Sequence, residues 1–396
     1  MNEPNIVVHV YGVSDVGRTR EHNEDAFMVA DLDKAQPLTF PSEQTQVPGE
    51  HGTLFMVADG MGGAAAGEIA SSMAVDVILS ELRGKWSSGP GTDPKVFAVT
   101  LHDATEVAND RIHEYASEHP ENRGMGTTAT VAGILGDTLY IAQVGDSRAY
   151  LMRQGEVRQL TKDQSLMQRL IEAGEITAEE AEVSERRNII LQALGPEAAI
   201  KVDITHQQLR RGDVLVLCSD GLSGVVRDHE IQRVARESSD LVTLCHQLIS
   251  LANESGGPDN ITVVAARFEG EGLVLPTDGD AVGHQTFAVG ETTPVTPHPR
   301  LEVSAPTPPR DELTEVLNAA PPAADHAAFP SLQPTGVRRA LTPADIDAAR
   351  AALGAGAAEA NGPPPKGRKR RAAVLIVAVA AIVVLVYGLV TYLRTK

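Results

Sequence analysis

The chain has 396 residues, enough for one large domain with appendages, and its 53 acidic and 34 basic residues give a formal net charge of −19. This acidic balance argues against a nucleic-acid binder, which usually presents a basic face. Its two cysteines, Cys218 and Cys245, are too few for a disulfide scaffold and indicate exposure to the cytosol.

Residues 6–268 have mixed α and β patterning. Helical spacing of apolar residues predicts two long helices, at 67–82 and 96–119. Several short strands around two helices predict an α+β fold in which helices pack outside an antiparallel sheet or sandwich. We interpret residues 165–195 as an excursion from this core. Runs rich in Val, Ile and Leu predict strands at 6–11, 54–58, 139–144, 149–152, 214–218 and 261–268.

Composition changes near residue 269. Residues 269–371 hold 15 of the 24 prolines of the chain. Such a segment buries too little apolar surface to offset its ordering entropy, so we predict a disordered linker. Residues 372–393 carry no charge, and a helix of this length spans roughly 33 Å, about a bilayer core. We predict a transmembrane helix here, with a buried core helix as the alternative.

Basic residues around 372–393 predict the orientation of this helix. Five bases lie at 366–371, and two follow the helix. This imbalance places the N-terminal side in the cytoplasm. The basic cluster alone would also suit a patch for nucleic acid or anionic lipid. We therefore predict a single-pass protein of the cell membrane with residues 6–268 in the cytoplasm.

Acidic corners stand at the ends of the apolar runs. Each corner alone is weak evidence for a functional site, because Asp-Gly is a common turn dipeptide. Carboxylates delivered by several strand ends, however, can converge on one rim and bind a hard cation. The corners are Asp59-Gly60, Gly145-Asp146, Asp220-Gly221 and Asp259-Asn260, with Arg20 standing five residues before Asp25 further upstream.

An aspartate cluster with few His or Cys neighbours selects magnesium or manganese over zinc or copper. Two such ions about 3.5–4 Å apart can share a water and lower its pKa towards neutrality. A nearby arginine grips phosphate oxygens through its planar guanidinium. Two ions, a shared water and an arginine suffice to hydrolyse a phosphomonoester without a covalent enzyme intermediate.

The order of these motifs resembles the metal-dependent protein phosphatases of the PPM (protein phosphatase 2C) type, and most of all their bacterial branch. The resemblance covers residues 6–268. Six ordered motifs carry it: Arg20-x4-Asp25, Asp59-Gly60-Met61-Gly62-Gly63, Gly126-Thr127-Thr128, Gly145-Asp146-Ser147-Arg148, Ser219-Asp220-Gly221 and Gly257-Pro258-Asp259-Asn260.

This resemblance implies a four-layer α-β-β-α sandwich, with two stacked antiparallel sheets flanked by helices. It implies that Asp59, Asp220 and Asp259 ligate two catalytic ions, Mn²⁺ or Mg²⁺. The carbonyl of Gly60 would complete one ligand shell. Asp146 would match, together with Asp220, a third and looser metal site of bacterial members.

The same resemblance implies roles for groups around the ions. Arg20 would hold the substrate phosphate. Glu24, Asp25 and Asn260 would order the ligands and waters that surround the ions. Residues 165–195 would form a flap beside the active site that tunes substrate choice.

The sequence departs from the family at two positions. Animal members carry His after Asp-Gly as the proposed general acid, whereas this chain has Met61, as bacterial relatives commonly do. The proton donor is then unassigned, with a metal-bound water as the default. Bacterial relatives often have Asp-His-Ser at the start of the flap, and this chain has Asp163-Gln164-Ser165. No role for His is therefore expected there.

We predict a protein serine/threonine phosphatase in which a water bridging two divalent ions attacks phosphorus in line. Its expected partners are phosphorylated Ser/Thr proteins and, by analogy, a membrane Ser/Thr kinase, with no nucleic acid and a monomeric catalytic domain. Two alternatives stay open. One is a phosphatase of small-molecule phosphate esters. The other is a phosphoprotein-binding pseudo-enzyme scaffold, which loss of metal aspartates would mark; none is lost.

Overall fold

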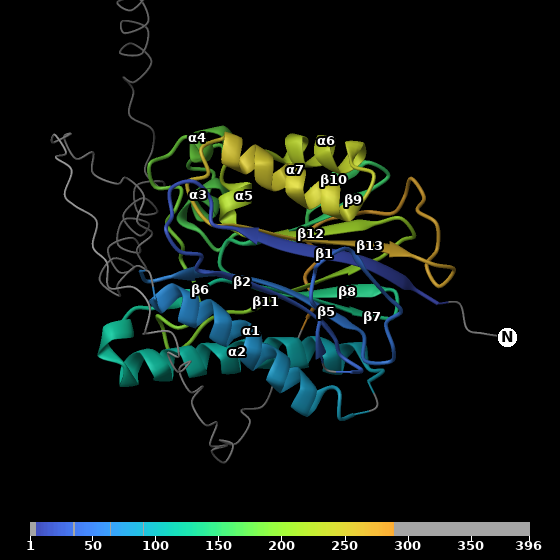
Figure 1. Ribbon diagram of the computed structural model, residues 1–396, viewed down its shortest axis with the longest axis horizontal. Coiled ribbons are helices and arrows are strands. Elements are labelled where there is room, and N and C mark those ends of the chain that lie inside the picture. Colours follow the sequence, from blue (N-terminus) through green and yellow to red (C-terminus); the bar gives the residue numbers. More distant parts are fainter. Residues whose placement is uncertain (1–4, 35, 64, 90, 289–396) are drawn as a thin grey trace, which may run out of the picture. The chain divides into compact units, whose positions relative to one another are not determined.

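The computed structural model describes residues 5–288 except 35, 64 and 90. Two antiparallel sheets form its core (Figure 1). The first has the spatial order β10-β9-β12-β13-β1-β4, with the bounds β1 Val7–Asp15, β4 Gln44–Gln46, β9 Arg148–Arg153, β10 Glu156–Gln159, β12 Val214–Cys218 and β13 Ile261–Glu269.

The second sheet has the spatial order β11-β8-β7-β5-β2-β3, and the short β6 pairs with β5 outside this path. Strand β5 lies in the middle and is buried along its whole length. The bounds are β2 Asp25–Asp31, β3 Gln36–Pro37, β5 Thr53–Met61, β6 Gly126–Thr127, β7 Ala129–Leu135, β8 Thr138–Val144 and β11 Asp203–Gln208.

Helices cover the outer face of each sheet, as Figure 1 shows. α1 (Ala66–Lys85) and α2 (Pro94–Glu118) pack on the second sheet, and α6 (Asp228–Glu237) and α7 (Leu241–Glu254) pack on the first. Asp93 begins α2 by accepting hydrogen bonds from two backbone N–H groups ahead of Pro94 at the first helical position. The shorter helices are η1 Pro120–Asn122, α3 Leu166–Glu172, α4 Ala178–Glu182 and α5 Asp220–Ser223.

The hydrophobic core lies in three layers, one between the two sheets and one beneath each helix pair. Between the sheets, Phe55 of β5 meets Phe268 of β13 edge to face, with ring centroids 6.3 Å apart. The predicted sandwich of two antiparallel sheets with helices outside is confirmed. The two predicted helices are confirmed as α1 and α2, and α6 and α7 form a second pair.

Polypeptide beyond the expected boundary at residue 268 packs on this sandwich. After β13 the chain turns back, and residues 277–287, called the strap here, run along the free edge of β11. Thr286 forms an antiparallel bridge with Thr205, and the Phe287 N–H donates to the Ile204 carbonyl at 2.8 Å. The strap therefore adds backbone pairing at the edge of the second sheet.

The remaining predictions for the C-terminal part concern residues beyond 288. The rest of the predicted linker and the predicted transmembrane helix at 372–393 lie outside the described residues. Within the described ranges, no helix combines the length and the apolar character needed to cross a membrane.

Candidate metal centre

Two strands of the second sheet bring the first pair of carboxylates together. In the register of β2 with β5, Asp25 lies directly opposite Asp59, at the end of the pairing between these strands. Directly opposed residues of antiparallel strands have Cβ atoms about 4.5–5.5 Å apart. The strand pairing therefore sets two acids side by side at one rim of the sandwich.

Hydrogen bonds from the other sheet reach the same carboxylate. The Ser219 hydroxyl, after β12, and the Thr262 hydroxyl, on β13, each donate to Asp25 Oδ2 at 2.7 Å. Ser219 is followed at once by Asp220, and Asp259 stands just ahead of β13. Residues of both sheets thus meet at the carboxylate of Asp25.

The threonines of the Gly126-Thr127-Thr128 motif hold the backbone of Asp59. The Asp59 N–H donates to the Thr128 hydroxyl at 2.9 Å, and the Thr127 hydroxyl donates to the Asp59 carbonyl at 3.0 Å. The Thr128 N–H reaches the same carbonyl at 3.0 Å. These contacts fix the position from which the nearly buried Asp59 side chain projects.

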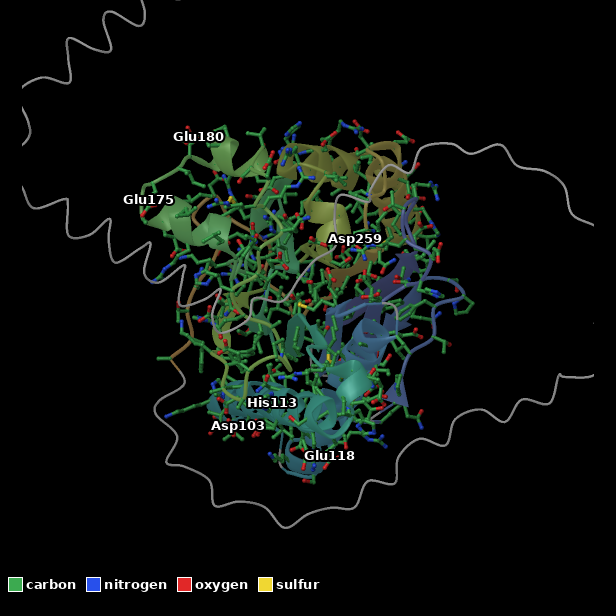
Figure 2. All side chains as sticks on the ribbon, turned by 90° about the vertical axis from the view of Figure 1, so that its left-hand side faces the viewer. Asp103, His113, Glu118, Glu175, Glu180 and Asp259 are labelled. Atoms are coloured by element: carbon green, nitrogen blue, oxygen red, sulfur yellow. The ribbon has the colours of Figure 1, made fainter. Side chains whose placement is uncertain are left out.

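Arg20 is held beside the acids by its own carboxylate partner. Arg20 Nη2 donates to Asp259 Oδ2 at 2.8 Å, and 28% of the arginine side chain is exposed. A ligand arriving from solvent can therefore reach the guanidinium. Figure 2 shows Asp259 near the middle of the layers, whereas Asp103 lies on the outer helical layer.

Asn260 shapes the loop that carries Arg20. Its side-chain oxygen accepts from the Glu24 N–H at 2.8 Å, and its amide nitrogen donates to the carbonyls of Val16 and His22 at 3.0 and 2.9 Å. Because three points on the loop are tied to one buried side chain, Asn260 sets the path of the backbone on both sides of Arg20.

Burial and nearby negative charge raise the pKa values of Asp25, Asp259 and Glu24 at this rim. Burial is the largest cause of the raised pKa of Asp25, and repulsion from Asp59 comes next. The pKa of Asp259 is raised first by burial and then by Asp59, with Arg20 opposing. The pKa of Glu24 is also raised by burial, and repulsion from Asp259 and Asp59 adds to the effect of burial. Arg20 offsets only part of this negative charge.

These donors fit hard divalent cations. Buried oxygen ligands with excess negative charge are the environment that Mg²⁺ and Mn²⁺ prefer. Among the described residues, only His102, Asp103 and Glu106 of α2 form a trio of potential ligands with all atoms within 4.8 Å. This trio lies on α2 and contains none of the predicted site residues.

Two glycines form the floor of the site. A Cβ on Gly60 would collide with the carbonyl oxygens of Gly67 and Glu24, and a Cβ on Gly67 would collide with the Glu24 carboxylate. The end of β5, the start of α1 and Glu24 therefore approach closer than any other residue would allow. Gly67 was not among the predicted site residues, and no motif singled it out.

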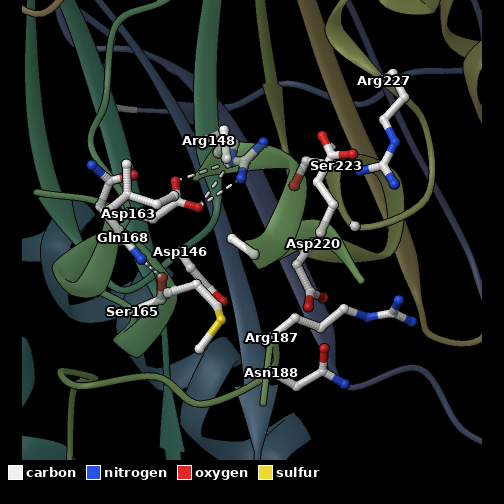
Figure 3. A pocket seen from close by; sticks show the side chains of 16 residues that line it. Asp146, Arg148, Asp163, Ser165, Gln168, Arg187, Asn188, Asp220, Ser223 and Arg227 are labelled. Atoms are coloured by element: carbon white, nitrogen blue, oxygen red, sulfur yellow. Dashed lines mark hydrogen bonds and ion pairs between the residues drawn. The ribbon is translucent and has the colours of Figure 1, made fainter. Parts of the chain in front are cut away.

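Asp146 and Asp220 line a neighbouring cavity of about 220 Å³. Figure 3 shows both aspartates with Arg187 and Asn188, which belong to the segment 165–195. The helices α3 and α4 contribute Met167 and Ala181 to the cavity lining, among other residues. The predicted excursion thus forms one wall of a cavity whose other wall carries two predicted site residues.

Met61 takes no part in proton transfer. Its side chain is only 3% exposed and clusters with Ile190 and Ala193 at the base of the segment 165–195. A thioether has no proton to donate. The departure noted in the sequence is therefore a packing contact beneath this segment.

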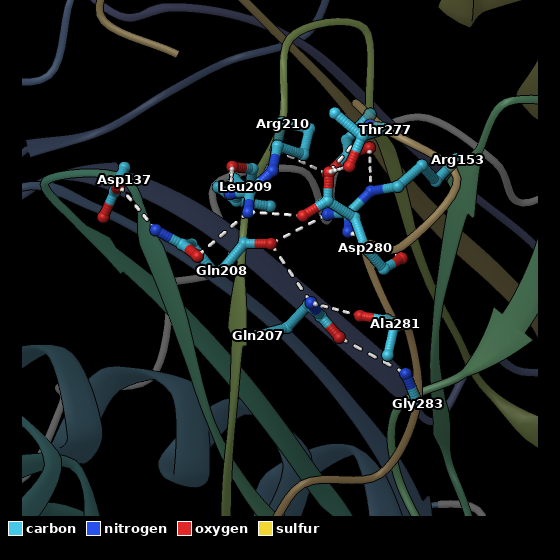
Figure 4. A network of polar contacts seen from close by, with 11 residues as sticks. Asp137, Arg153, Gln207, Gln208, Leu209, Arg210, Thr277, Asp280, Ala281 and Gly283 are labelled. Atoms are coloured by element: carbon cyan, nitrogen blue, oxygen red, sulfur yellow. Dashed lines mark hydrogen bonds and ion pairs between the residues drawn. The ribbon is translucent and has the colours of Figure 1, made fainter. Parts of the chain in front are cut away.

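The strap is anchored by polar contacts and reaches a second cavity. Arg210 pairs with Asp280 at 2.6 Å, and Gln207 donates to the Ala281 carbonyl while accepting from the Gly283 N–H, as seen in Figure 4. Further along, His284 of the strap lines a cavity of about 410 Å³ together with residues of the segment 165–195.

Comparison with known proteins identifies the relatives of this chain. The family described as Protein phosphatase 2C matches residues 14–261. The serine/threonine phosphatase stp of Listeria innocua is 36% identical over 258 residues, covering 65% of this chain and 94% of that protein.

Solved structures of bacterial serine/threonine phosphatases are also similar to this chain. The Mycobacterium tuberculosis serine/threonine phosphatase PstP/Ppp is 35% identical with a TM-score of 0.56, covering 66% of this chain and 99% of that chain. The catalytic domain of the serine/threonine protein phosphatase PstP in complex with two manganese ions is 34% identical with a TM-score of 0.54, covering 67% and 99%.

Proposed function

From the premise that this chain belongs to the protein phosphatase 2C family, and is a manganese- or magnesium-dependent protein-serine/threonine phosphatase, we propose that it hydrolyses phosphoserine and phosphothreonine at the rim described above. The observation that carries the proposal is the ion pair of Arg20 with Asp259, next to half-buried carboxylates of raised pKa. A guanidinium able to bind phosphate and carboxylates able to hold divalent ions lie next to each other there.

Each group at the rim has its own role. Asp59, Asp220 and Asp259, with the Gly60 carbonyl, would hold two divalent ions, and Asp146 with Asp220 would hold a third. When bound, these ions supply the Lewis acidity that activates water and neutralises charge on phosphate.

Arg20 binds phosphate oxygens through its planar guanidinium and orients the ester for in-line attack. Asp25, fixed by two hydroxyl groups, orders solvent near Asp59. Glu24 lies against Gly67 at the floor and orders solvent on that side.

One experiment separates protein substrates from small-molecule esters. The full chain is incubated in manganese buffer with phosphoserine and phosphothreonine peptides, a phosphotyrosine peptide and a panel of sugar and nucleotide monophosphates. We expect the phosphoserine and phosphothreonine peptides to be hydrolysed with the highest kcat/KM. A preference for a small ester would overturn the protein-phosphatase assignment, and no manganese-dependent hydrolysis at all would favour a binding scaffold.

The proposed domain organisation places a catalytic unit at residues 6–288, a linker up to residue 371 and a membrane helix at 372–393. The support is the uncharged 22-residue stretch and the excess of bases before it. The catalytic unit would face the cytoplasm as a monomer. A tethered enzyme of this kind would act on phosphoproteins near the bilayer, a membrane Ser/Thr kinase among them.

Membrane fractionation tests the tether. The full chain should remain with membranes after a carbonate wash, whereas a chain ending at residue 288 should be found in the soluble fraction. Recovery of the full chain in the soluble fraction would refute the membrane helix without touching the phosphatase assignment.

A further inference from the structure

Gln164 stands where the segment 165–195, called the flap here, leaves and rejoins the sandwich. The Leu191 N–H, on the returning leg, donates to the Gln164 carbonyl at 2.8 Å. Next to it, Ser165 and Ile190 form an antiparallel bridge. The two legs of the flap are therefore joined at the backbone of Gln164.

The backbone and side chain of Gln164 clamp one turn from both sides. The Gln164 N–H donates to the Gly145 carbonyl, and the Gly145 N–H donates to Gln164 Oε1, both at 2.9 Å. Gly145 has a φ of +99°, and a Cβ there would approach the Thr128 side chain to 2.6 Å. The turn thus needs both its glycine and its clamp, and the residue it delivers is Asp146.

The other end of the amide faces the edge of the second sheet. Gln164 Nε2 donates to Asp203 Oδ2 at 3.1 Å and to the Lys201 carbonyl at 3.2 Å. Both partners only accept, and the Gly145 N–H only donates. These partners determine the orientation of the amide.

From these contacts we propose that Gln164 is a positioning residue, which holds the Asp146 turn in place and joins it to the base of the flap and to β11. This inference rests on the proposed function, because it gives the clamped turn a purpose: Asp146 must face Asp220 across the 220 Å³ cavity for the two to share an ion. A metal ligand on an unclamped glycine turn would lose much of its preorganisation.

The side chain that the family resemblance leads us to expect at this position could span the same partners. A neutral imidazole offers one acceptor and one donor. It can accept from the Gly145 N–H and donate towards Asp203. Methionine has a similar length but provides no comparable hydrogen bonds, and glutamate would direct a carboxylate oxygen at Asp203.

The test compares variants of the full chain: Gln164→Met, Gln164→His and a control, Gln192→Met. Gln164 and Gln192 both line the 410 Å³ cavity, and the Gln192 side-chain oxygen accepts from the Lys201 N–H at 2.7 Å. Gln192 is therefore an amide in the same cavity wall that hydrogen-bonds to Lys201 and not to the Asp146 turn. The measurements are backbone amide exchange over residues 143–147 without metal, manganese binding by calorimetry, and the manganese dependence of phosphoester hydrolysis.

We expect Gln164→Met to speed amide exchange at the turn and to weaken manganese binding by about 10- to 100-fold at the weakest site. The KM for a small phosphoester at saturating metal should stay unchanged. Gln164→His should restore most of both properties, and Gln192→Met should resemble the wild type.

Unchanged exchange in Gln164→Met would overturn the proposal. Equal effects in Gln164→Met and Gln192→Met would do the same, because they would indicate general loosening of the cavity wall. Amide exchange is measured without metal or substrate, so this arm stands even if the wild-type chain shows no phosphatase activity. Absence of phosphatase activity in the wild-type chain would contradict the proposed function instead.

Discussion

Arg20 and Asp259, 239 positions apart in the chain, are joined by a hydrogen-bonded ion pair of 2.8 Å. Asn260 brings the loop that carries Arg20 to the start of the strand that follows Asp259. Its side chain hydrogen-bonds to the backbone of Val16, His22 and Glu24. The pairing of β1 with β13 thus brings the two ends of the catalytic unit together at Arg20 and Asp259.

Replacing Arg20 by Ala should mainly raise the KM for small phosphoesters. A hydrogen bond to a charged group contributes about 1.5–3 kcal/mol, so the loss corresponds to roughly a tenfold or larger rise. Arg20→Lys should recover part of it, because an ammonium keeps the charge but lacks the planar fork. Steady-state kinetics at saturating manganese check this, and a normal KM in Arg20→Ala would contradict phosphate binding by this side chain.

Replacing Asp220 by Ala should abolish metal-dependent hydrolysis while the protein stays folded. Asp220 lines the 220 Å³ cavity together with Asp146, and its carboxylate is one of the proposed metal ligands. Activity, manganese binding and the melting temperature are measured together. Asp103→Ala, which removes a carboxylate from the outer face of α2, serves as the control. Full activity in Asp220→Ala would refute the proposed ligand set.

Protonation of His51 should be visible in the fluorescence of Trp86, the single tryptophan of the chain. The two ring nitrogens of His51 face Asp33 Oδ1 at 2.9 Å and the Gly89 carbonyl at 3.0 Å. Both partners only accept, so the doubly protonated ring satisfies both. The hydrogen bond to the Gly89 carbonyl is the largest cause that raises the pKa of His51 above 6.5, and the one to Asp33 is the next. The Trp86 indole lies edge-on to His51, with ring centroids 6.2 Å apart.

The sign of the pH effect follows from that raised pKa. Stability contributed by the protonated ring is fully present below pH 6.5 and is lost as the pH rises through the folded-state value. Trp86 emission, quenched by the imidazolium, should increase over the same interval. His51→Gln should abolish this titration, and His246→Gln, in the α7 layer, should preserve it. An unaltered titration in His51→Gln would show that another group is responsible.

Ending the chain at residue 268 instead of 288 should destabilise the catalytic unit. The shorter chain loses the strap, with the ion pair of Asp280 and the ring contacts of Phe287 with Tyr140 and His206. Full burial of a large apolar side chain contributes about 1.5–3 kcal/mol, and the partly buried Phe287 contributes less than that. Urea unfolding of both truncations checks this, and equal midpoints would show that the strap contributes nothing.

Much of the candidate site was predictable from residue order. The acidic corners at strand ends pointed to Asp59, Asp220 and Asp259, because strand termini of stacked sheets can meet at one rim. Register was not predictable: the pairing of Asp25 with Asp59 depends on how β2 lies on β5, which the short apolar runs do not determine. Gly67 could not be predicted as a site residue, because its role is to leave space for the Glu24 carboxylate.

The strap was missed for a physical reason. Its composition is polar with few apolar residues, which favours disorder when judged segment by segment. Its order comes instead from specific partners elsewhere, such as Arg210 and Gln207, and from backbone pairing with β11. Helix α6 escaped prediction in a similar way, since its ten residues bury only Ile231, Val234 and Ala235.

The pairing of the strap with β11 also bears on the solubility of the catalytic unit. An exposed outer strand offers unpaired N–H and C=O groups on which another copy can stack, the first step of edge-to-edge aggregation. Here a few residues of the same chain already occupy those groups. By covering this edge, a short polar segment of the same chain opposes self-association of the catalytic unit.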